Sequence, residues 1–150
     1  MLLGFKKRFE PFILDGSKTH TIRAKLKPSK LGHANRSRRA GAICHCYIGL
    51  RQKGAKLLGR WKCTRVEDIR IEVAFGPYKV PAWVAMWIEG QRLTLGEVNQ
   101  LCWQDGFRST LVQHAWFEFA EFWGKEHRKS LGDDLTLRFR GDLIHWEYKR

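Results

Sequence analysis

Apolar positions near the start of the chain follow first a helical spacing and then a strand pattern. Phe9, Phe12 and Ile13 recur at i, i+3 and i+4, and Gly16 follows where helices commonly stop. This spacing predicts a short helix that ends at the glycine. The following stretch, 19–23, is rich in β-branched residues and therefore predicts a strand.

The middle of the chain predicts further strands. Apolar residues dominate 43–50 and 57–71, and the turn sequence Gln-Lys-Gly at 52–54 separates the two runs. A looser segment containing glycine and proline leads to the tryptophan-rich run 83–88, which predicts another strand.

Two helices are predicted after these strands. Thr94 and Glu97 have the spacing of a capping box, which marks a helix start, and this helix is expected to end near Gly106. A second helix is expected from about Thr110 to Gly124. The apolar stripe of the first helix is Leu95, Val98, Leu101 and Cys102, and that of the second is Val112, Ala115, Trp116, Phe119, Phe122 and Trp123.

The end of the chain predicts a β-hairpin, in which the runs 135–139 and 143–148 flank a turn at Gly141-Asp142. Strands at both ends of the chain with helices between them predict an α+β fold. We expect a small closed or nearly closed sheet decorated by helices rather than a βαβ parallel sheet, because the alternation of elements is irregular. No repeat or linker divides the 150 residues, so a single domain over 1–150 is expected.

The excess of positive charge lies wholly in the first half of the chain. Residues 1–70 carry 18 Lys and Arg against 4 Asp and Glu, whereas residues 71–150 carry 10 against 11. The run 23–39 holds seven of these cations and no acid, and predicts a long solvated loop. Segregated positive charge attracts polyanions, so RNA is the expected partner, although a merely soluble cationic protein is an alternative. A membrane partner is disfavoured, because the sequence contains no basic amphipathic helix.

Cysteine and histidine spacing argues against a metal centre. Cys44, Cys46, Cys63 and Cys102 lack the paired spacing of a zinc site, and the six histidines are scattered. On a strand His45 would face away from its two neighbouring cysteines, so we expect buried free thiols and no cofactor. The amino-terminal charges follow a very short apolar stretch, an order unlike a secretory signal, so a cytoplasmic protein is expected.

Reactive side chains are densest between the predicted first helix and strand. Lys18, Thr19, Thr21 and Arg23 lie within six residues of one another, and on a strand Thr19, Thr21 and Arg23 share one face. Such a cluster suits an anion or a carbonyl oxygen, with Arg as a bidentate donor and Thr as donor or nucleophile. The alternative is a basic hairpin edge whose side chains are solvated.

The stretch from Phe9 to Arg23, Phe-x-x-Phe-Ile-Leu-x-Gly-x-Lys-Thr-x-Thr-Ile-Arg, resembles the opening signature of the ASCH (activating signal cointegrator homology) domain. Gly41 before a strand, and the run 104–109 (Gln-Asp-Gly-Phe-Arg-Ser) before an aromatic helix, also fit that family. The resemblance spans roughly residues 2–140 and implies a PUA-like small β-barrel with inserted helices. It also implies a role on RNA or modified nucleosides.

Some small bacterial members of the family remove the acetyl group from 4-N-acetylcytidine with a Lys, a Thr and a Glu. The resemblance places the Lys at Lys18, the Thr at Thr21 and the acid at Asp105, with Glu89 as a weaker candidate for the acid. Asp is one methylene shorter than Glu, so its carboxylate reaches less far. As a hypothesis, Thr21 attacks the amide carbonyl, Lys18 takes its proton, and Arg23 or a backbone N–H holds the oxyanion. The base role requires a lysine pKa below the ordinary value of about 10.4.

Three classes of function therefore remain open. The first is a non-catalytic RNA-binding module, the second a small hydrolase acting on an acylated nucleoside (with ribonuclease activity as a variant), and the third a protein-interaction module. Trp116 and Trp123 are expected in the core, and packing is also favoured over base stacking for each of the other five tryptophans. The residues expected to contact substrate or RNA are Thr19, Arg23, Lys25, Arg36, Arg38 and Arg39.

Overall fold

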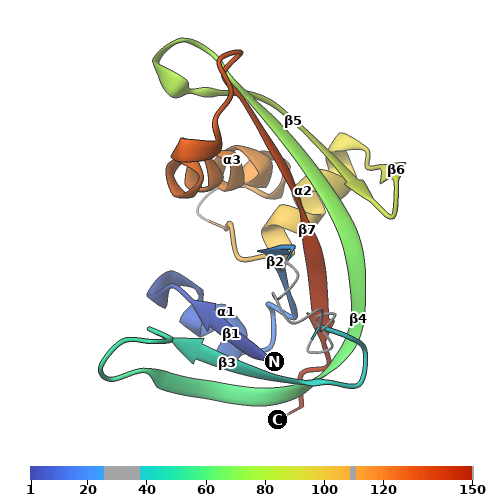
Figure 1. Ribbon diagram of the computed structural model, residues 1–150. Coiled ribbons are helices and arrows are strands. Elements are labelled where there is room, and N and C mark those ends of the chain that lie inside the picture. Colours follow the sequence, from blue (N-terminus) through green and yellow to red (C-terminus); the bar gives the residue numbers. More distant parts are fainter. Residues whose placement is uncertain (26–37, 109–110, 150) are drawn as a thin grey trace, which may run out of the picture. The chain divides into compact units, whose positions relative to one another are not determined.

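The computed structural model of the chain describes residues 1–25, 38–108 and 111–149, and has mixed α and β structure (Figure 1). The chain divides into two compact units. Unit 1 comprises Met1–Val66 and Leu143–Arg150, and unit 2 comprises Glu67–Asp142. The single domain over 1–150 stays a prediction. In the described ranges, no helix has the length and apolar character needed to cross a membrane.

Two long strands run through both units, and the remaining elements belong to one unit each. In unit 1, β1 pairs in parallel with β3, β3 pairs antiparallel with the first part of β4, and β2 pairs with β7. The elements of unit 1 are β1 (Leu2–Phe5), η1 (Lys7–Phe9), α1 (Glu10–Leu14), β2 (His20–Ala24) and β3 (Ile43–Ile48), and the shared strands are β4 (Lys56–Phe75) and β7 (Thr136–Trp146).

Side-chain alternation in β3 explains one wall of the unit 1 core. Cys44 and Cys46 are fully buried, while His45 between them is half-buried on the opposite face. Cys44 lies opposite Trp61 of β4, which is also buried. All four cysteines are buried free thiols, as predicted.

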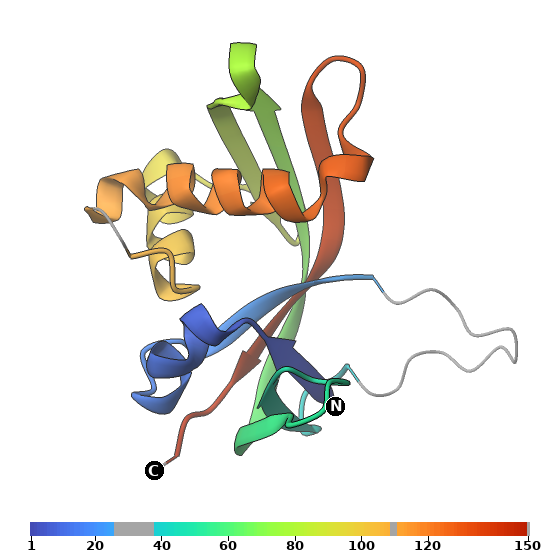
Figure 2. The same ribbon diagram turned by 90° about the vertical axis from the view of Figure 1, so that its left-hand side faces the viewer.

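In unit 2, helices pack against an antiparallel sheet. The second part of β4 pairs with β5, β5 pairs with β6, and α2 and α3 pack on each other and on β5 (Figure 2). The remaining elements are η2 (Pro77–Lys79), β5 (Pro81–Ile88), β6 (Gln91–Arg92), α2 (Leu95–Gln104), η3 (Val112–His114), α3 (Ala115–Glu126) and η4 (Arg128–Ser130).

Several elements lie where the sequence predicts them. The short helix α1 is followed by Gly16, whose φ of +78° is a conformation that only glycine adopts without strain. The capping box is present, because Thr94 Oγ1 accepts a hydrogen bond from the backbone N–H of Glu97 and the Glu97 carboxylate accepts one from the backbone N–H of Thr94. The predicted strands at 19–23, 43–50, 57–71 and 83–88 are all present, with ends shifted by up to four residues.

The predicted carboxy-terminal hairpin is wrong. Residues 136–146 form one continuous strand, β7, which passes straight through Gly141 and Asp142. A tight hairpin turn needs residues with positive φ at its centre, and Gly141 is not among the glycines with positive φ. Asp142 is also buried rather than exposed at a turn.

The helix boundaries and stripes also need correction. α3 begins at Ala115 rather than near Thr110, and Gly124 lies inside it instead of ending it. Leu95 is 59% exposed, because it is the first residue of α2, and the polar Asn99 is buried instead. Among the tryptophans, Trp61, Trp123 and Trp146 are in the core, Trp87, Trp103 and Trp116 are half-buried, and Trp83 is exposed.

Candidate functional site

A hydrogen-bonded turn leads from α1 to the candidate site. The Asp15 carboxylate accepts hydrogen bonds from the backbone N–H of Ser17 at 2.8 Å and from its hydroxyl at 2.5 Å. Gly16 supplies the left-handed conformation between them. The backbone N–H of Lys18 then donates to the carbonyl oxygen of Phe12 at 2.8 Å. These bonds define where the lysine side chain leaves the backbone.

Lys18 is buried to an extent that is rare for lysine, since its exposed fraction is 1%. Its Nζ lies 5.1 Å from the centre of the Phe9 ring and 5.9 Å from that of the Phe5 ring. Both distances are within the range of a cation–π attraction, which favours the charged form of the amine. Burial favours the neutral form, so the two effects act on Lys18 in opposite directions.

Arg23 lies close to the same Phe5 ring as Lys18. The Arg23 guanidinium carbon is 4.9 Å from the centre of the Phe5 ring, and Nη2 donates to the carbonyl oxygen of Gly4 at 2.6 Å. Thr21 is two residues before Arg23 on β2, so both side chains extend from the same face of the strand. The predicted amine and guanidinium within unit 1 therefore both lie at the Phe5 ring, and Thr21 extends from the same strand face as Arg23.

Thr21 is itself buried, with an exposed fraction of 5%.

The thiol of Cys46 also lies in this cluster. Burial raises the pKa of Cys46 to about 12, while the positive charges of Arg23 and Lys18 act to lower it. Cys46 thus stays a neutral thiol and serves as a wall of the site. Phe5, Phe9 and Cys46 were not among the predicted site residues, although the inward position of Cys46 follows from strand alternation.

Asp105 belongs to unit 2. It is 6% exposed, caps the carboxy-terminal end of α2, and precedes Gly106, which has a φ of +101°. Phe107 next to it is buried against Phe119. The grouping of Asp105 with Lys18 and Thr21 in one site stays a prediction. Glu89, the weaker candidate, is exposed in the turn after β5, where its carboxylate accepts a hydrogen bond from the backbone N–H of Asp68.

The other predicted binding residues lie around the ends of β2. Thr19 accepts a backbone hydrogen bond from Trp146 of β7 at 2.9 Å. Arg38 donates from Nη1 to the carbonyl oxygen of Ala24, and Lys25 and Arg39 are exposed. Arg36 and most of the predicted basic loop lie outside the described residues.

Two histidines that are far apart in sequence meet beside this strand. The rings of His20 on β2 and His145 on β7 have their centres 5.6 Å apart, and His20 is buried. Sequence spacing could not indicate this pair, because it arises from the pairing of β2 with β7.

Charge is divided sharply between the two units. Unit 1 has 19 Lys and Arg residues against 3 Asp and Glu residues, a formal charge of +16. Unit 2 has 9 against 12, a formal charge of −3. The buried Lys18 cluster therefore belongs to a strongly cationic unit, and such a unit attracts polyanions from solution.

Within unit 1, the geometry offers a nucleophilic hydroxyl, an amine and a guanidinium beside apolar rings, a set suited to binding and activating a carbonyl group. No protein-family model, curated protein or solved structure matches this chain.

Proposed function

We propose that this chain is an ASCH-type protein that binds RNA or a modified nucleoside and hydrolyses an acyl amide of the 4-N-acetylcytidine type. The observation that carries the proposal is the burial of Lys18 against Phe5 and Phe9, three residues before the buried Thr21. Removing an ammonium group from water is costly, and an apolar side chain of similar length would fill the same space at lower cost. A chemical role explains why a lysine occupies the position.

The proposed fold is a single PUA-like domain, a small β-barrel with inserted helices. Two observations support it. Both ends of the chain supply strands to unit 1, through β1, β2 and β7. The helices α2 and α3 occur between them in the sequence, as the proposal requires.

In the proposed reaction the Thr21 hydroxyl attacks the amide carbonyl and passes its proton to the neutral Lys18 amine. The C–N bond then breaks, and the Lys18 ammonium returns the proton to the departing cytosine amine. Water hydrolyses the resulting threonine ester to release the acid and restore the hydroxyl. Arg23 stabilises the oxyanion, and Asp105 orients the substrate amine.

The proposal is tested by measuring hydrolysis of free 4-N-acetylcytidine. Lys18→Ala and Thr21→Val should each lower the rate by about 100-fold or more, the usual contribution of a general base or nucleophile. Lys62→Ala removes the same charge from an exposed position on β4 and should leave the rate unchanged. Circular dichroism establishes that each variant is folded. Undiminished hydrolysis by folded Lys18→Ala and Thr21→Val would exclude the mechanism.

The pH dependence of the rate is a second test of the same mechanism. The base role needs the neutral amine, whereas the rings of Phe5 and Phe9 favour the charged one. Hydrolysis should therefore accelerate as the pH rises and the neutral fraction of Lys18 grows. A rate that is flat across the alkaline range would show that the lysine acts only as a cation.

A non-catalytic RNA-binding module is the second candidate, favoured by the +16 charge of unit 1. Affinity for single-stranded RNA should then fall steeply with salt, and neutralising Arg38 and Arg39 should each reduce the slope by about one. A nucleoside hydrolase instead turns over an uncharged substrate with little dependence on salt. A protein-interaction module would show neither behaviour.

A further inference from the structure

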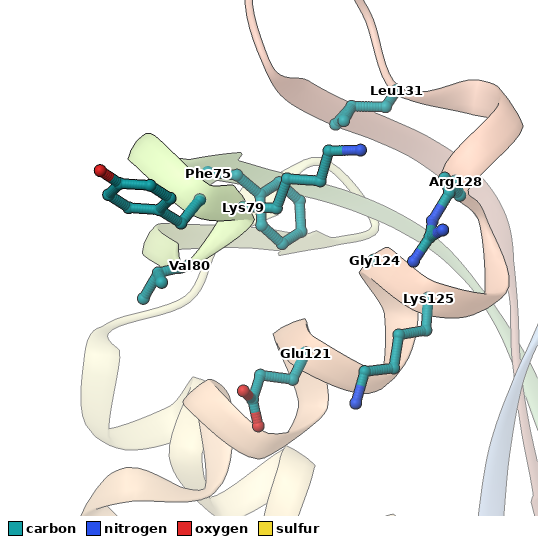
Figure 3. A pocket seen from close by; sticks show the side chains of 9 residues that line it. Phe75, Lys79, Val80, Glu121, Gly124, Lys125, Arg128 and Leu131 are labelled. Atoms are coloured by element: carbon teal, nitrogen blue, oxygen red, sulfur yellow. The ribbon is translucent and has the colours of Figure 1, made fainter.

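Unit 2 contains a pocket of about 310 Å³, far larger than the space one water molecule needs. Its walls come from η2, from the last turns of α3 and from the segment after it (Figure 3). Phe75 and Leu131 provide apolar surface, and Lys79, Lys125 and Arg128 provide three positive charges. Figure 3 shows the Lys79 side chain extended toward the side of the hollow where Leu131 and Arg128 lie.

The charge of the pocket is opposite to that of its unit. Unit 2 has more acidic than basic residues, yet the pocket is lined by three cations and by Glu121 as its one acid. The charged groups of Lys79, Lys125 and Arg128 form no ion pair or hydrogen bond with any other residue in the described part of the chain. Three unpaired like charges around one hollow repel one another, and an anion placed between them relieves that repulsion.

Gly124 allows Phe75 to form a wall of the hollow. A Cβ atom at this position in α3 would lie 2.7 Å from Cζ of the Phe75 ring, closer than side chains can approach. The glycine therefore lets the ring pack directly against the helix beneath the charged groups. The pocket thus combines an apolar floor with a cationic rim, the usual composition of a small-ligand site.

The backbone at the rim is strained. Tyr78 and Lys79 are consecutive non-glycine residues with φ of +60° and +59°, each in the left-handed region. The side chain of Tyr78 is 99% exposed, so no packing of its ring accounts for the conformation. The strained turn does, however, set the direction in which Lys79 leaves the chain, and backbone strain is characteristic of binding sites.

We propose that this pocket binds a phosphate group, carried either by a small phosphorylated molecule or by the backbone of RNA. The cations at the end of α3 could also serve the helix alone, because Lys125 and Arg128 complement its dipole. Lys79 comes from a different element, and the helix dipole gives no reason for its position. The inference is independent of the Lys18 site and does not rest on the proposed hydrolysis.

The test is a nuclear magnetic resonance titration of the full chain, isotope-labelled, with inorganic phosphate, cytidine 5′-monophosphate and a short single-stranded RNA lacking a terminal phosphate. The amide signals of Gly124 and Lys125 should shift on binding. Lys79→Gln, Lys125→Gln and Arg128→Gln should each weaken binding by about tenfold, as expected for loss of one charge-assisted contact. The matched control is Lys129→Gln, which removes an exposed charge that does not line the pocket and should change affinity by less than about twofold.

The three probes distinguish the sources of the phosphate. If the pocket signals shift with inorganic phosphate or the nucleotide, the pocket binds a terminal phosphate. If they shift only with the RNA, the pocket binds a phosphate of the RNA backbone. Either result supports the site if each of the three pocket variants weakens the binding that produces it. The proposal is overturned if no probe moves the pocket signals at millimolar concentration, or if Lys129→Gln weakens binding as much as the pocket variants.

Discussion

The ring of Tyr148 packs against the Cα of Gly16, closely enough that a Cβ on Gly16 would lie 2.5 Å from Cδ1 of the ring. The hydroxyl of Tyr148 donates a hydrogen bond to the carbonyl oxygen of Leu14, at the end of α1. The carboxy-terminal segment thereby holds the turn from which Lys18 enters the core.

Gly16→Ala should lower the free energy of unfolding by at least about 2 kcal/mol, since it adds left-handed strain of about 1–2 kcal/mol to a steric clash. Urea denaturation measures the change. The matched control is Gly54→Ala, where φ is +87° but no atom lies within 4 Å of the added Cβ, so only the strain applies. Equal losses of unfolding free energy in the two variants would show that the Tyr148 ring moves away from the added methyl group without destabilising the fold.

The buried thiols should make stability depend on alkaline pH. Burial is the main cause that raises the pKa of Cys44 and of Cys46 to about 12 from the ordinary value of 9.0. Below pH 9 both states hold these protons. Above it only the unfolded chain releases them, so stability is lost as the pH rises toward 12. Each thiol contributes a slope of about 1.4 kcal/mol per pH unit.

Denaturation series from pH 8 upward give the free energy of unfolding of wild type and of Cys46→Ala at each pH. The difference between their two slopes against pH is the contribution of Cys46. Comparing slopes rather than absolute stabilities removes the effect of the small cavity that the alanine leaves. A slope unaffected by the substitution would mean that Cys46 ionises as readily in the folded protein as in the unfolded chain.

His127 should make unit 2 sensitive to mild acid. Its ring stacks on Trp123 with centres 4.6 Å apart, and burial lowers the pKa of His127 below the ordinary value of 6.5, against the opposing effect of Glu126. Because the folded state favours the neutral ring, this stabilisation is present above pH 6.5 and is lost as the pH falls through the lower folded pKa. His127→Phe keeps the stacking and should remove this part of the acid dependence, measured by thermal unfolding from pH 7 to 5.

Tyr78→Gly should raise the free energy of unfolding by about 0.5–1 kcal/mol, because glycine adopts a positive φ without steric strain and this gain exceeds its entropic cost. The fully exposed ring has no packing to lose. Chemical denaturation measures the gain. A destabilised variant would contradict the assignment of strain to this residue.

Local rules predicted the elements whose ends are defined by neighbouring residues. The stop at Gly16 and the capping box of Thr94 and Glu97 depend on contacts within a few positions, and both are present. The same rules failed at Gly124 and Gly141, where a glycine was taken to mark a helix end and a turn. Neither glycine ends an element in the structure. Gly124 makes room for Phe75, and Gly141 lies within β7.

The candidate site was predicted in part for the same reason. Lys18, Thr21 and Arg23 are close in sequence, so their clustering on β2 and the turn before it followed from the pattern. The ring of Phe5 that lies near both Lys18 and Arg23 comes from β1, and its position depends on strand pairing that no local signal reports. The pocket of unit 2 was missed because Lys79 lies over forty residues from Lys125 and Arg128, without a motif to connect them.

The discontinuity of unit 1 has a consequence for biosynthesis. All of residues 67–142 leave the ribosome before the segment from Leu143 onward does, so unit 2 has its full sequence while unit 1 still lacks a strand. Trp146, which packs on Phe5, and Tyr148, which packs on Gly16, are translated only after all of unit 2. The nascent chain must therefore carry an unfinished, highly cationic amino-terminal segment until the residues from Leu143 onward are translated, a period in which that segment is exposed to ribosomal RNA.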